Sequence, residues 1–265
     1  MRAKTVVVTG ASTGIGEELA VVLAARGAHV VLAARGEEAL QRVKARCEAA
    51  GGRALVVPTD VGDPEACRRL VERTVEAFGG LDVLVNNAGV SMDARVDEVK
   101  DLGLYERLMR INYLGAVYCT HYALPHLKAR RGLVVAVSSL TGKAGVPTLS
   151  GYAASKHAMH GFFDSLRIEL RGTGVDVTVV CPGFVATNIR ASALGADGHP
   201  LRKDQDASQD KMDVGTCVAI LLRAIERRER EVVMTPKGKV GQFIKLLAPG
   251  LVDSLAARAV RHRRR

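Results

Sequence analysis

The 265-residue sequence contains no tryptophan, and aromatic residues make up only 4% of it. Proteins that bind single-stranded nucleic acids stack the bases on aromatic side chains within basic surfaces, and no such basic-aromatic segment is present. A nucleic-acid partner is therefore not expected. No apolar run reaches the ~18 residues that a membrane span requires, so a soluble or peripheral protein is predicted.

Cysteine is also sparse and follows no ligand pattern. Five cysteines are scattered along the chain, without Cys-x-x-Cys spacing or a matching histidine pattern. We expect reduced core residues and predict no metal site. The first strand is expected to begin near Thr5, which leaves no room for a signal or transit sequence and predicts a cytoplasmic location. The cysteines are Cys47, Cys67, Cys119, Cys181 and Cys217.

Positive charge is abundant, and it is concentrated at the carboxyl end. The net charge is +10, and five arginines among the last eight residues supply half of it. Residues 240–260 contain apolar pairs interrupted by Pro249-Gly250, a pattern that predicts two short amphipathic segments. The tail is either a solvated terminus or a peripheral membrane contact, and the sequence leaves both readings open.

Apolar runs rich in valine and leucine alternate with stretches of helical periodicity along the chain. Runs without polar alternation need cover on both faces, which predicts a parallel sheet with helices on each side. The expected fold is a single α/β domain, doubly wound around a seven-stranded parallel sheet. The strands are expected at 5–9, 29–34, 54–58, 83–86, 133–137, 177–181 and 231–234.

One long segment interrupts this order. Residues 184–213 are polar, contain glycine and proline breakers, and carry several aspartates, among them Asp204, Asp206 and Asp210. A loop of this length is usually functional or mobile. Because it follows the sixth strand, it would cover the carboxyl ends of the strands as a substrate loop, and a disordered acidic loop is a compatible alternative. We expect a catalytic domain at 1–236 and an amphipathic, basic helical extension at 237–265.

A glycine-rich turn follows the first expected strand. In Thr9-Gly10-Ala11-Ser12-Thr13-Gly14-Ile15-Gly16 the glycines have the spacing Gly-x-x-x-Gly-x-Gly, and a helical pattern follows. Glycines let a backbone approach a pyrophosphate closely, and the positive end of a helix stabilises its charge. The turn predicts a dinucleotide site.

Tyr152 and Lys156 stand four residues apart, so a phenol and an ammonium share one helix face. A nearby cation favours phenolate, and Lys156 is therefore expected to lower the Tyr152 pKa from about 10 toward the working pH. Ser138 and Ser139 directly follow the expected strand at 133–137, at the sheet edge where ligands of parallel sheets bind.

Jointly, these segments resemble the short-chain dehydrogenase/reductase family, whose marks recur over about residues 4–236. Residues 138–143 and 154–166 are similar to the branch of the member 7 dehydrogenase/reductases and 11-beta-hydroxysteroid dehydrogenase type 1. The resemblance implies a Rossmann fold. The matching marks are Thr9 to Gly16, Asn86-Asn87-Ala88-Gly89, Asn112, Ser139, Tyr152, Lys156 and Pro182-Gly183.

The resemblance also implies catalytic roles. Tyr152 would be the acid, and Ser139, at the family's spacing, would donate a hydrogen bond to the carbonyl oxygen. Lys156 would hold the nicotinamide ribose and depress the Tyr152 pKa. Asn112 would position a water for proton relay, although taken alone it reads as an ordinary polar helix residue. No catalytic triad or metal spacing involves His157 or His160, which are expected to be packing or surface residues.

NADP(H) is the expected cofactor, because the second strand ends in Ala33-Ala34-Arg35-Gly36 with no carboxylate before Glu37. A guanidinium suits the 2′-phosphate of NADP, whereas NAD is usually held by a carboxylate there. Thr13 departs from the basic residue that many NADP-using relatives carry. The expected cofactor-binding residues are Gly10, Ser12, Thr13, Gly14, Ile15, Gly16, Arg35, Asp60, Val61, Asn86, Ala88, Gly89, Tyr152, Lys156, Pro182, Gly183, Val185 and Thr187.

The sequence thus predicts an NADP(H)-dependent carbonyl reductase, reversible as an alcohol dehydrogenase, for a hydrophobic ketone, aldehyde or secondary alcohol. Steroid-like or lipid-derived substrates rest on the branch resemblance alone. A 3-oxoacyl-thioester reductase and a non-catalytic cofactor-binding protein are the alternatives. Lys143, Leu149, Val185 and Tyr113 are candidates for the substrate pocket. A homodimer or homotetramer is expected through the helices at 105–127 and 152–171, as the family commonly pairs them.

Overall fold

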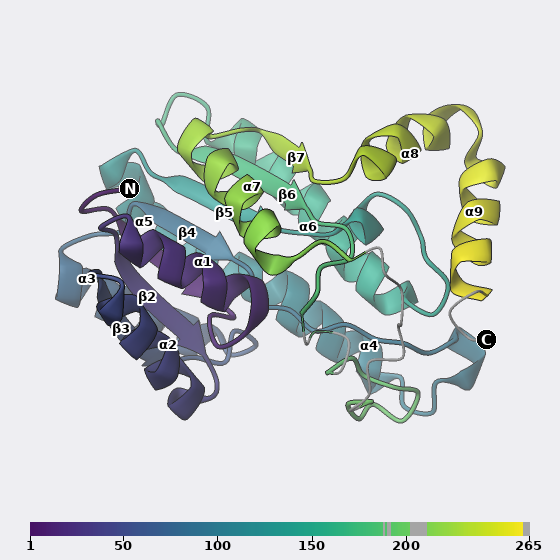
Figure 1. The fold of residues 1–265 in the computed structure, drawn as a ribbon, viewed down its shortest axis with the longest axis horizontal. Coiled ribbons are helices and arrows are strands. Elements are labelled where there is room, and N and C mark those ends of the chain that lie inside the picture. The colour runs from purple at the N-terminus through teal and green to yellow at the C-terminus, as the bar shows by residue number, and fades with distance from the viewer. Residues whose placement is uncertain (188, 190–191, 202–210, 262–265) are drawn as a thin grey trace.

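The sheet has seven strands, all parallel, in the order β3-β2-β1-β4-β5-β6-β7 within the described residues. The computed structural model describes residues 1–187, 189, 192–201 and 211–261. The predicted doubly wound α/β fold is confirmed (Figure 1). The strands are β1 (Thr5–Thr9), β2 (His29–Ala34), β3 (Arg53–Pro58), β4 (Val83–Asn86), β5 (Leu133–Val137), β6 (Asp176–Cys181) and β7 (Glu231–Val233).

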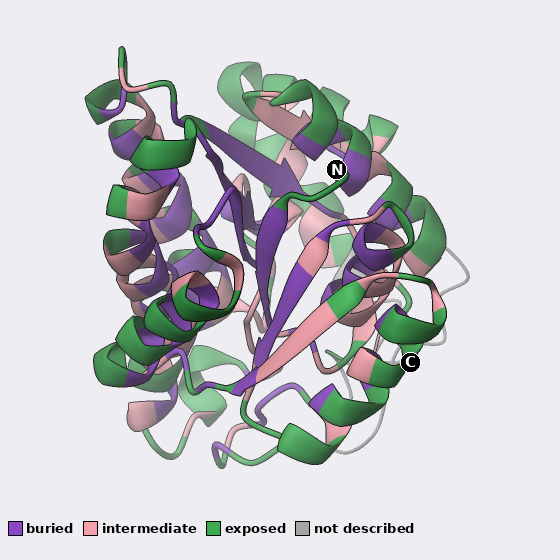
Figure 2. Cartoon of the chain, turned by 90° about the vertical axis from the view of Figure 1, so that its left-hand side faces the viewer, coloured by how far each residue is buried: buried purple, intermediate pink, exposed green. Residues whose placement is uncertain are grey.

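Successive residues of the central strand face two separate cores. Val6 and Val8 of β1 pack in one hydrophobic cluster, and Val7 between them packs in the other. This alternation follows from the strand period of two, and both faces are apolar because both are covered by helices. Figure 2 shows the buried strands between helices whose outer faces are exposed.

In the described part of the chain, three helices cover each face of the sheet. Helices α1 (Gly14–Ala25), α2 (Glu37–Ala49) and α7 (Val214–Arg227) pack on the side of Val6 and Val8. The other side is covered by α3 (Pro64–Phe78), α5 (Gly115–Arg130) and α6 (Ser150–Glu169).

The helix predicted at 105–127 is not regular. It consists of α4 (Gly103–Leu108), a π-helical turn, η2 (Met109–Leu114), and then α5. Isolated π turns often mark functional positions. Short 3₁₀ turns, η1 (Val96–Glu98) and η3 (Leu140–Gly142), precede α4 and follow β5.

The chain between β1 and β4 crosses to one side of the sheet, and the chain after β4 crosses to the other. β1 and β4 are neighbours, with β2 and β3 on one side and β5 to β7 on the other. A reversal of this kind leaves a crevice at the carboxyl ends of the strands, where α/β proteins bind ligands. The glycine turn after β1 and the serines after β5 both lie at that edge.

The carboxyl end forms two helices, as the sequence predicts. α8 (Pro236–Leu247) begins at Thr235, whose Oγ1 accepts from the Gly238 N–H at 3.0 Å, and α9 (Pro249–Arg261) follows after the break at Ala248. The two helices stand away from the sheet at one end of the molecule (Figure 1). Within the described residues, no helix combines the length and the apolar character needed to cross a membrane.

Candidate active site

The glycine turn is held in place by a threonine at the end of β1. Thr9 Oγ1 donates to the Val85 carbonyl at 3.2 Å and accepts from the backbone N–H groups of Asn87 and Ala88, both at 3.0 Å. The side chain of Asn87 donates to the Thr9 and Gly10 carbonyls at 2.8 and 3.3 Å. These bonds join the turn after β1 to the loop after β4, so both strand ends present one surface.

Two glycines in the turn have a steric requirement. A Cβ on Gly16 would stand 2.4 Å from the Gly10 carbonyl oxygen, and Gly14 has a φ of +60°. Thr13, at the N-cap of α1, makes no side-chain bond to the helix. Tight backbone packing and a helix start with unclaimed N–H groups are what a pyrophosphate site needs, so these residues fit a dinucleotide.

Three of the four predicted catalytic side chains meet at one cavity. Ser139, Tyr152 and Lys156 line a cavity of about 440 Å³, which Ile15, Gly89, Pro182, Gly183, Val185 and Thr187 also line. Ser139 follows β5, while Tyr152 and Lys156 project from α6, so the sheet and one helix bring them together. Thr187 also lies against the glycine turn, because a Cβ on Gly14 would be 3.1 Å from its Cγ2.

The Tyr152 pKa departs from the sequence prediction. Burial of the phenol raises its pKa to about 12, and a hydrogen bond from Ser139 lowers it by less. The expectation that Lys156 sets a low Tyr152 pKa is therefore wrong for the protein alone. The Lys156 ammonium lies 5.7 Å from the centre of the tyrosine ring, and desolvation outweighs it.

Lys156 is itself buried, with 3% of its surface exposed. Its Nζ donates to the Val137 carbonyl at 2.8 Å, at the end of β5. Burial lowers the Lys156 pKa to about 8. Nζ also donates to Met159 Sδ at 3.5 Å, which leaves one of its three N–H donors for the cavity.

Asn112 lies behind this cavity and has 0% of its surface exposed. Its Oδ1 accepts from the Val90 N–H at 2.8 Å, and its Nδ2 donates to the Val90 carbonyl and to Ser155 Oγ, both at 2.9 Å. Ser155 Oγ in turn donates to the Tyr152 carbonyl at 2.8 Å. Taken alone, Asn112 was expected to be an ordinary polar helix residue. The structure shows instead that its side chain connects η2 to the loop after β4 and to α6.

The residues predicted to bind the adenosine half of the cofactor include three that follow β2 and β3. Arg35 follows β2 and is exposed, and across the described chain no hydrogen bond or ion pair engages its guanidinium. Asp60 is exposed after β3 and accepts from the Gly62 N–H at 2.9 Å, and Val61 beside it is buried. The predicted residues that do not line the cavity are Gly10, Ser12, Thr13, Gly14, Gly16, Arg35, Asp60, Val61, Asn86, Ala88 and Asn112.

Of the neighbouring asparagines Asn86 and Asn87, the sequence predicts the first as a cofactor-binding residue, and this is the less exposed of the two. Asn86 is buried and donates to Thr120 Oγ1 of α5 at 3.0 Å. Asn87, within the same quoted motif, lines the cavity. The strand period separates the two, because neighbouring residues at the end of β4 point in opposite directions.

Among the pocket candidates, Lys143, Leu149 and Val185 line the cavity. Tyr113 is not among the described lining residues, and its ring packs edge-on against Phe162. Of the predicted substrate loop, Ile189, Ala193 and Leu201 contribute lining, so described parts of it do reach the cavity. Asp204, Asp206 and Asp210 lie outside the described residues.

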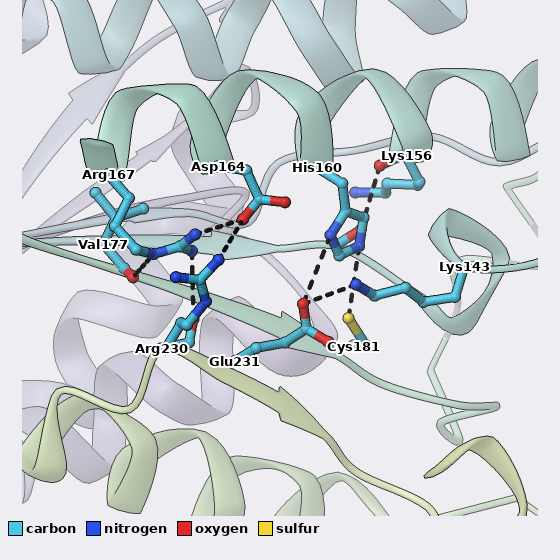
Figure 3. A network of polar contacts seen from close by, with 10 residues as sticks. Lys143, Lys156, His160, Asp164, Arg167, Val177, Cys181, Arg230 and Glu231 are labelled. Carbon is cyan, nitrogen blue, oxygen red and sulfur yellow. Dashed lines mark hydrogen bonds and ion pairs between the residues drawn. The ribbon is translucent and has the colours of Figure 1, made fainter. Parts of the chain in front are cut away.

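Two features of the site were not predicted. The carboxyl-terminal helices line the cavity through Gly238, Gly241, Gln242, Ile244, Val252, Leu255 and Ala256. A polar network also lies between α6 and the edge of the sheet (Figure 3). In it, Lys143 pairs with Glu231 at 2.7 Å, and His160 lies 4.0 Å from that carboxylate and 3.6 Å from Cys181 Sγ.

This network leaves His160 uncharged. Burial first, and the Lys143 cation second, lower the His160 pKa to about 4. His157, by contrast, is exposed. Both histidines therefore occupy packing or surface positions, as the sequence predicts. All five cysteines are buried free thiols.

The fold and the site define a dinucleotide-binding α/β protein. The profile described as short chain dehydrogenase matches residues 4–196. The dehydrogenase/reductase SDR family member 7B of Bos taurus is 38% identical, over 100% of this chain and 84% of its own. An 11-beta-hydroxysteroid dehydrogenase A of Sesamum indicum is 38% identical, over 94% of this chain and 73% of its own.

Among solved structures, a short chain dehydrogenase/reductase from Burkholderia phymatum in complex with NAD superposes with a TM-score of 0.84. It is 25% identical and covers 94% of this chain and 95% of its own. The chain therefore belongs to the short-chain dehydrogenase/reductase family, whose members are oxidoreductases that use a nicotinamide cofactor. The resemblance to the member 7 and 11-beta-hydroxysteroid dehydrogenase branch is confirmed.

Proposed function

We propose that the protein is an NADP(H)-dependent oxidoreductase that interconverts the carbonyl and secondary alcohol of a hydrophobic substrate. The observation that carries the proposal is the meeting of Ser139, Tyr152 and Lys156 at a cavity whose other walls are mainly apolar. Reduction of a carbonyl requires a donor to the developing alkoxide and a proton for it. Ser139 and Tyr152 supply these two functions.

The protein side chains divide the work by position. In the proposed reaction, Ser139 Oγ donates a hydrogen bond to the substrate oxygen, and Tyr152 Oη delivers the proton to it. Lys156 holds the cofactor ribose and favours the tyrosinate that proton transfer leaves behind. The nicotinamide cofactor, when bound, supplies or accepts the hydride.

The raised pKa of Tyr152 fits the direction of the reduction. A phenol with a pKa of about 12 is protonated at neutral pH, so the acid is ready to donate. The reverse oxidation needs tyrosinate. Cofactor and substrate must then lower the Tyr152 pKa within the closed complex, and the buried Lys156 cation is the group available for this.

The choice of NADP(H) is supported by Arg35. Its exposed guanidinium stands directly after β2, and the carboxylate of Glu38 on α2 is paired with Arg42 at 2.9 Å. A cation there accommodates a 2′-phosphate through bidentate bonds. The Burkholderia phymatum structure holds NAD, so this preference requires its own test.

The apolar substrate class is supported by the cavity walls. Met92, Val146, Leu149, Ile244 and Val252 surround the region beyond Ser139 and Tyr152. An apolar cavity with few polar groups at one end orients a hydrophobic molecule with its oxygen at those groups. The branch similarity favours a steroid-like or lipid-derived ketone, and a 3-oxoacyl thioester is the competing substrate.

We also propose that the protein is a homo-oligomer and that it is located in the cytoplasm. Helices α5 and α6 form the proposed pairing surface of a homodimer or homotetramer, and Ile168 near the end of α6 is 61% exposed. A light-scattering mass of one chain would contradict this assembly. Five free thiols fit a reducing compartment, which supports the cytoplasm.

The test is a coenzyme-resolved substrate screen. Oxidation of NADPH and of NADH is followed with steroid ketones, retinal, aromatic ketones and 3-oxoacyl thioesters. Turnover with NADPH and a bulky apolar ketone supports the proposal. Turnover confined to the thioesters would favour the competing reductase, and bound NADPH without turnover of any compound would favour a cofactor-binding protein.

A further inference from the structure

We propose that the carboxyl-terminal hairpin, formed by α8 and α9, docks the protein on an anionic lipid surface while its inner side closes the substrate cavity. The chain has ten large hydrophobic residues exposed among those described, and six of them lie on this hairpin. They are Val240, Phe243, Leu246, Leu247, Leu251 and Leu255.

The two sides of α8 have different tasks. Gly238, Gly241 and Gln242 follow helical spacing and line the cavity. Phe243, Leu246 and Leu247 are 65%, 80% and 89% exposed and do not line it. The cavity therefore accounts for the inner side of α8, and it leaves these three apolar side chains on the outer side exposed.

The inner side is fixed, so the outer residues cannot simply turn inward. Lys245 Nζ donates to the Lys143 carbonyl at 2.7 Å. Gly238 lies so close to Leu140 that a Cβ on it would be 2.5 Å from Leu140 Cδ2. Both contacts hold α8 against the loop that follows Ser139.

Charge identifies the partner. From Pro236 onward the sequence has eight lysines and arginines against one acidic residue, Asp253. Lys239 and Arg258 are exposed on the hairpin. A second copy of this surface would bring like charges together, whereas anionic lipid headgroups offer the opposite charge and an apolar layer beneath them. The occupant that fits both properties is a lipid surface.

The arrangement gives the cavity a route from the lipid. Val252, Leu255 and Ala256 of α9 line the cavity, while Leu251 in the same helix is 52% exposed. One hairpin thus contacts the proposed lipid layer and the substrate space together. A substrate dissolved in the membrane can reach the cavity beside these helices without entering bulk water. This last step rests on the proposed reductase function, whereas the docking does not.

The docking is tested by co-sedimentation of the full chain with phosphatidylcholine vesicles, with and without phosphatidylserine. We expect binding to the anionic vesicles that weakens as salt is raised. L246S/L247S should bind at least about tenfold more weakly, since two apolar side chains are lost from the interface. V96S/L102S is the matched control, with residues 65% and 73% exposed outside the hairpin, and should bind as the wild type does.

A second pair of variants tests the charge. K239E/R258E should bind anionic vesicles about thirtyfold more weakly or worse, given about fivefold for each cation removed. R223E/R227E, two exposed cations of α7, is its control and should not differ from the wild type. Wild-type protein that stays in the supernatant with every vesicle overturns the proposal. So does a light-scattering mass that falls in L246S/L247S with vesicle binding unchanged, which would assign the surface to a second copy.

The substrate route has a separate readout. With a ketone dissolved in anionic vesicles, L246S/L247S should show a higher apparent KM than the wild type, with the same kinetics on a water-soluble ketone. Equal KM values on vesicles would overturn the route and leave the docking intact. Loss of activity on both substrates would count against the route, because L246S/L247S would then have altered the cavity itself. Inactivity of the wild type would count against the proposed function alone.

Discussion

Asn112 and Val90 form a reciprocal pair of hydrogen bonds: Asn112 Oδ1 accepts from the Val90 N–H at 2.8 Å, and Asn112 Nδ2 donates to the Val90 carbonyl at 2.9 Å. The Asn112 amide bonds both the N–H and the C=O of Val90, as a residue of a neighbouring strand would, and it thereby joins η2 to the loop after β4. It satisfies two backbone groups beside the cavity, which would otherwise lack partners.

Substituting Asn112 by alanine should therefore destabilise the whole protein. Two backbone groups of Val90 and the hydroxyl of Ser155 lose their bonds, and we expect the free energy of unfolding to fall by about 3 kcal/mol. Urea denaturation measures it. Ser155→Ala removes the bonds of its hydroxyl to Asn112 and to the Tyr152 carbonyl but keeps both bonds between Asn112 and Val90, and it should cost less, about 1 kcal/mol. Unchanged stability of Asn112→Ala together with lost turnover would instead assign Asn112 to proton relay alone.

Lys156 should make stability depend on pH. Its folded pKa of about 8 lies below the 10.5 of an unperturbed lysine, so between these values the unfolded chain holds more protons. Stability contributed by Lys156 therefore rises with pH within that window, by about 2 kcal/mol from about pH 8 to about pH 10. Urea denaturation of Lys156→Met should lack this rise relative to the wild type. Parallel pH curves for the two proteins would refute a buried lysine of low pKa.

The two serines after β5 should differ in their effect on catalysis. Ser139 lines the cavity beside Tyr152, so Ser139→Ala should lower kcat about 10²- to 10³-fold, the usual cost of one donor to a developing oxyanion. Ser138 lines the same cavity, but its Oγ donates to the Lys156 carbonyl at 3.5 Å, whereas Ser139 is the serine bonded to Tyr152. Ser138→Ala should therefore cost less than tenfold. Steady-state kinetics on one ketone decide the matter. A larger loss in Ser138→Ala would move the oxyanion donor to that residue.

Arg35 should control the preference for NADPH over NADH. Arg35→Ala removes the guanidinium proposed to meet the 2′-phosphate, and NADPH affinity should fall about ten- to a hundredfold with NADH affinity unchanged. Arg42→Ala, which removes the cation paired with Glu38, is the control and should alter neither. Fluorescence titration with both coenzymes gives the result. An equal loss for both coenzymes would mean that Arg35 does not read the phosphate.

The sheet could be predicted because its information is local. Runs such as Val6-Val7-Val8 and Leu133–Val137 are apolar at every position, and only a parallel sheet with two covered faces uses them in that way. The bounds of β1, β2, β4 and β5 match the prediction, and β3, β6 and β7 differ by one residue at one end. The glycine turn could also be predicted from the sequence, because the close backbone contact that requires glycine joins Gly10 and Gly16, only six residues apart.

The site's electrostatics were less accessible to sequence reasoning. The spacing of Tyr152 and Lys156 says that they share a face, but not that burial raises one pKa and lowers the other. Asn112, within the π turn, bonds to Val90, which is 22 residues away in the chain. The contact that brings α8 to the cavity joins Lys245 to Lys143 across 102 residues. Such contacts exist only after the fold has formed.

The central claim, that Tyr152 is the proton donor of a working oxidoreductase, is tested most directly by Tyr152→Phe. Phenylalanine keeps the ring in its buried place and removes only the hydroxyl. The single measurement is NADPH oxidation with the best ketone, beside a fluorescence titration of NADPH. The account predicts that turnover falls at least about a hundredfold while NADPH still binds. Turnover near the wild-type rate in Tyr152→Phe would contradict it.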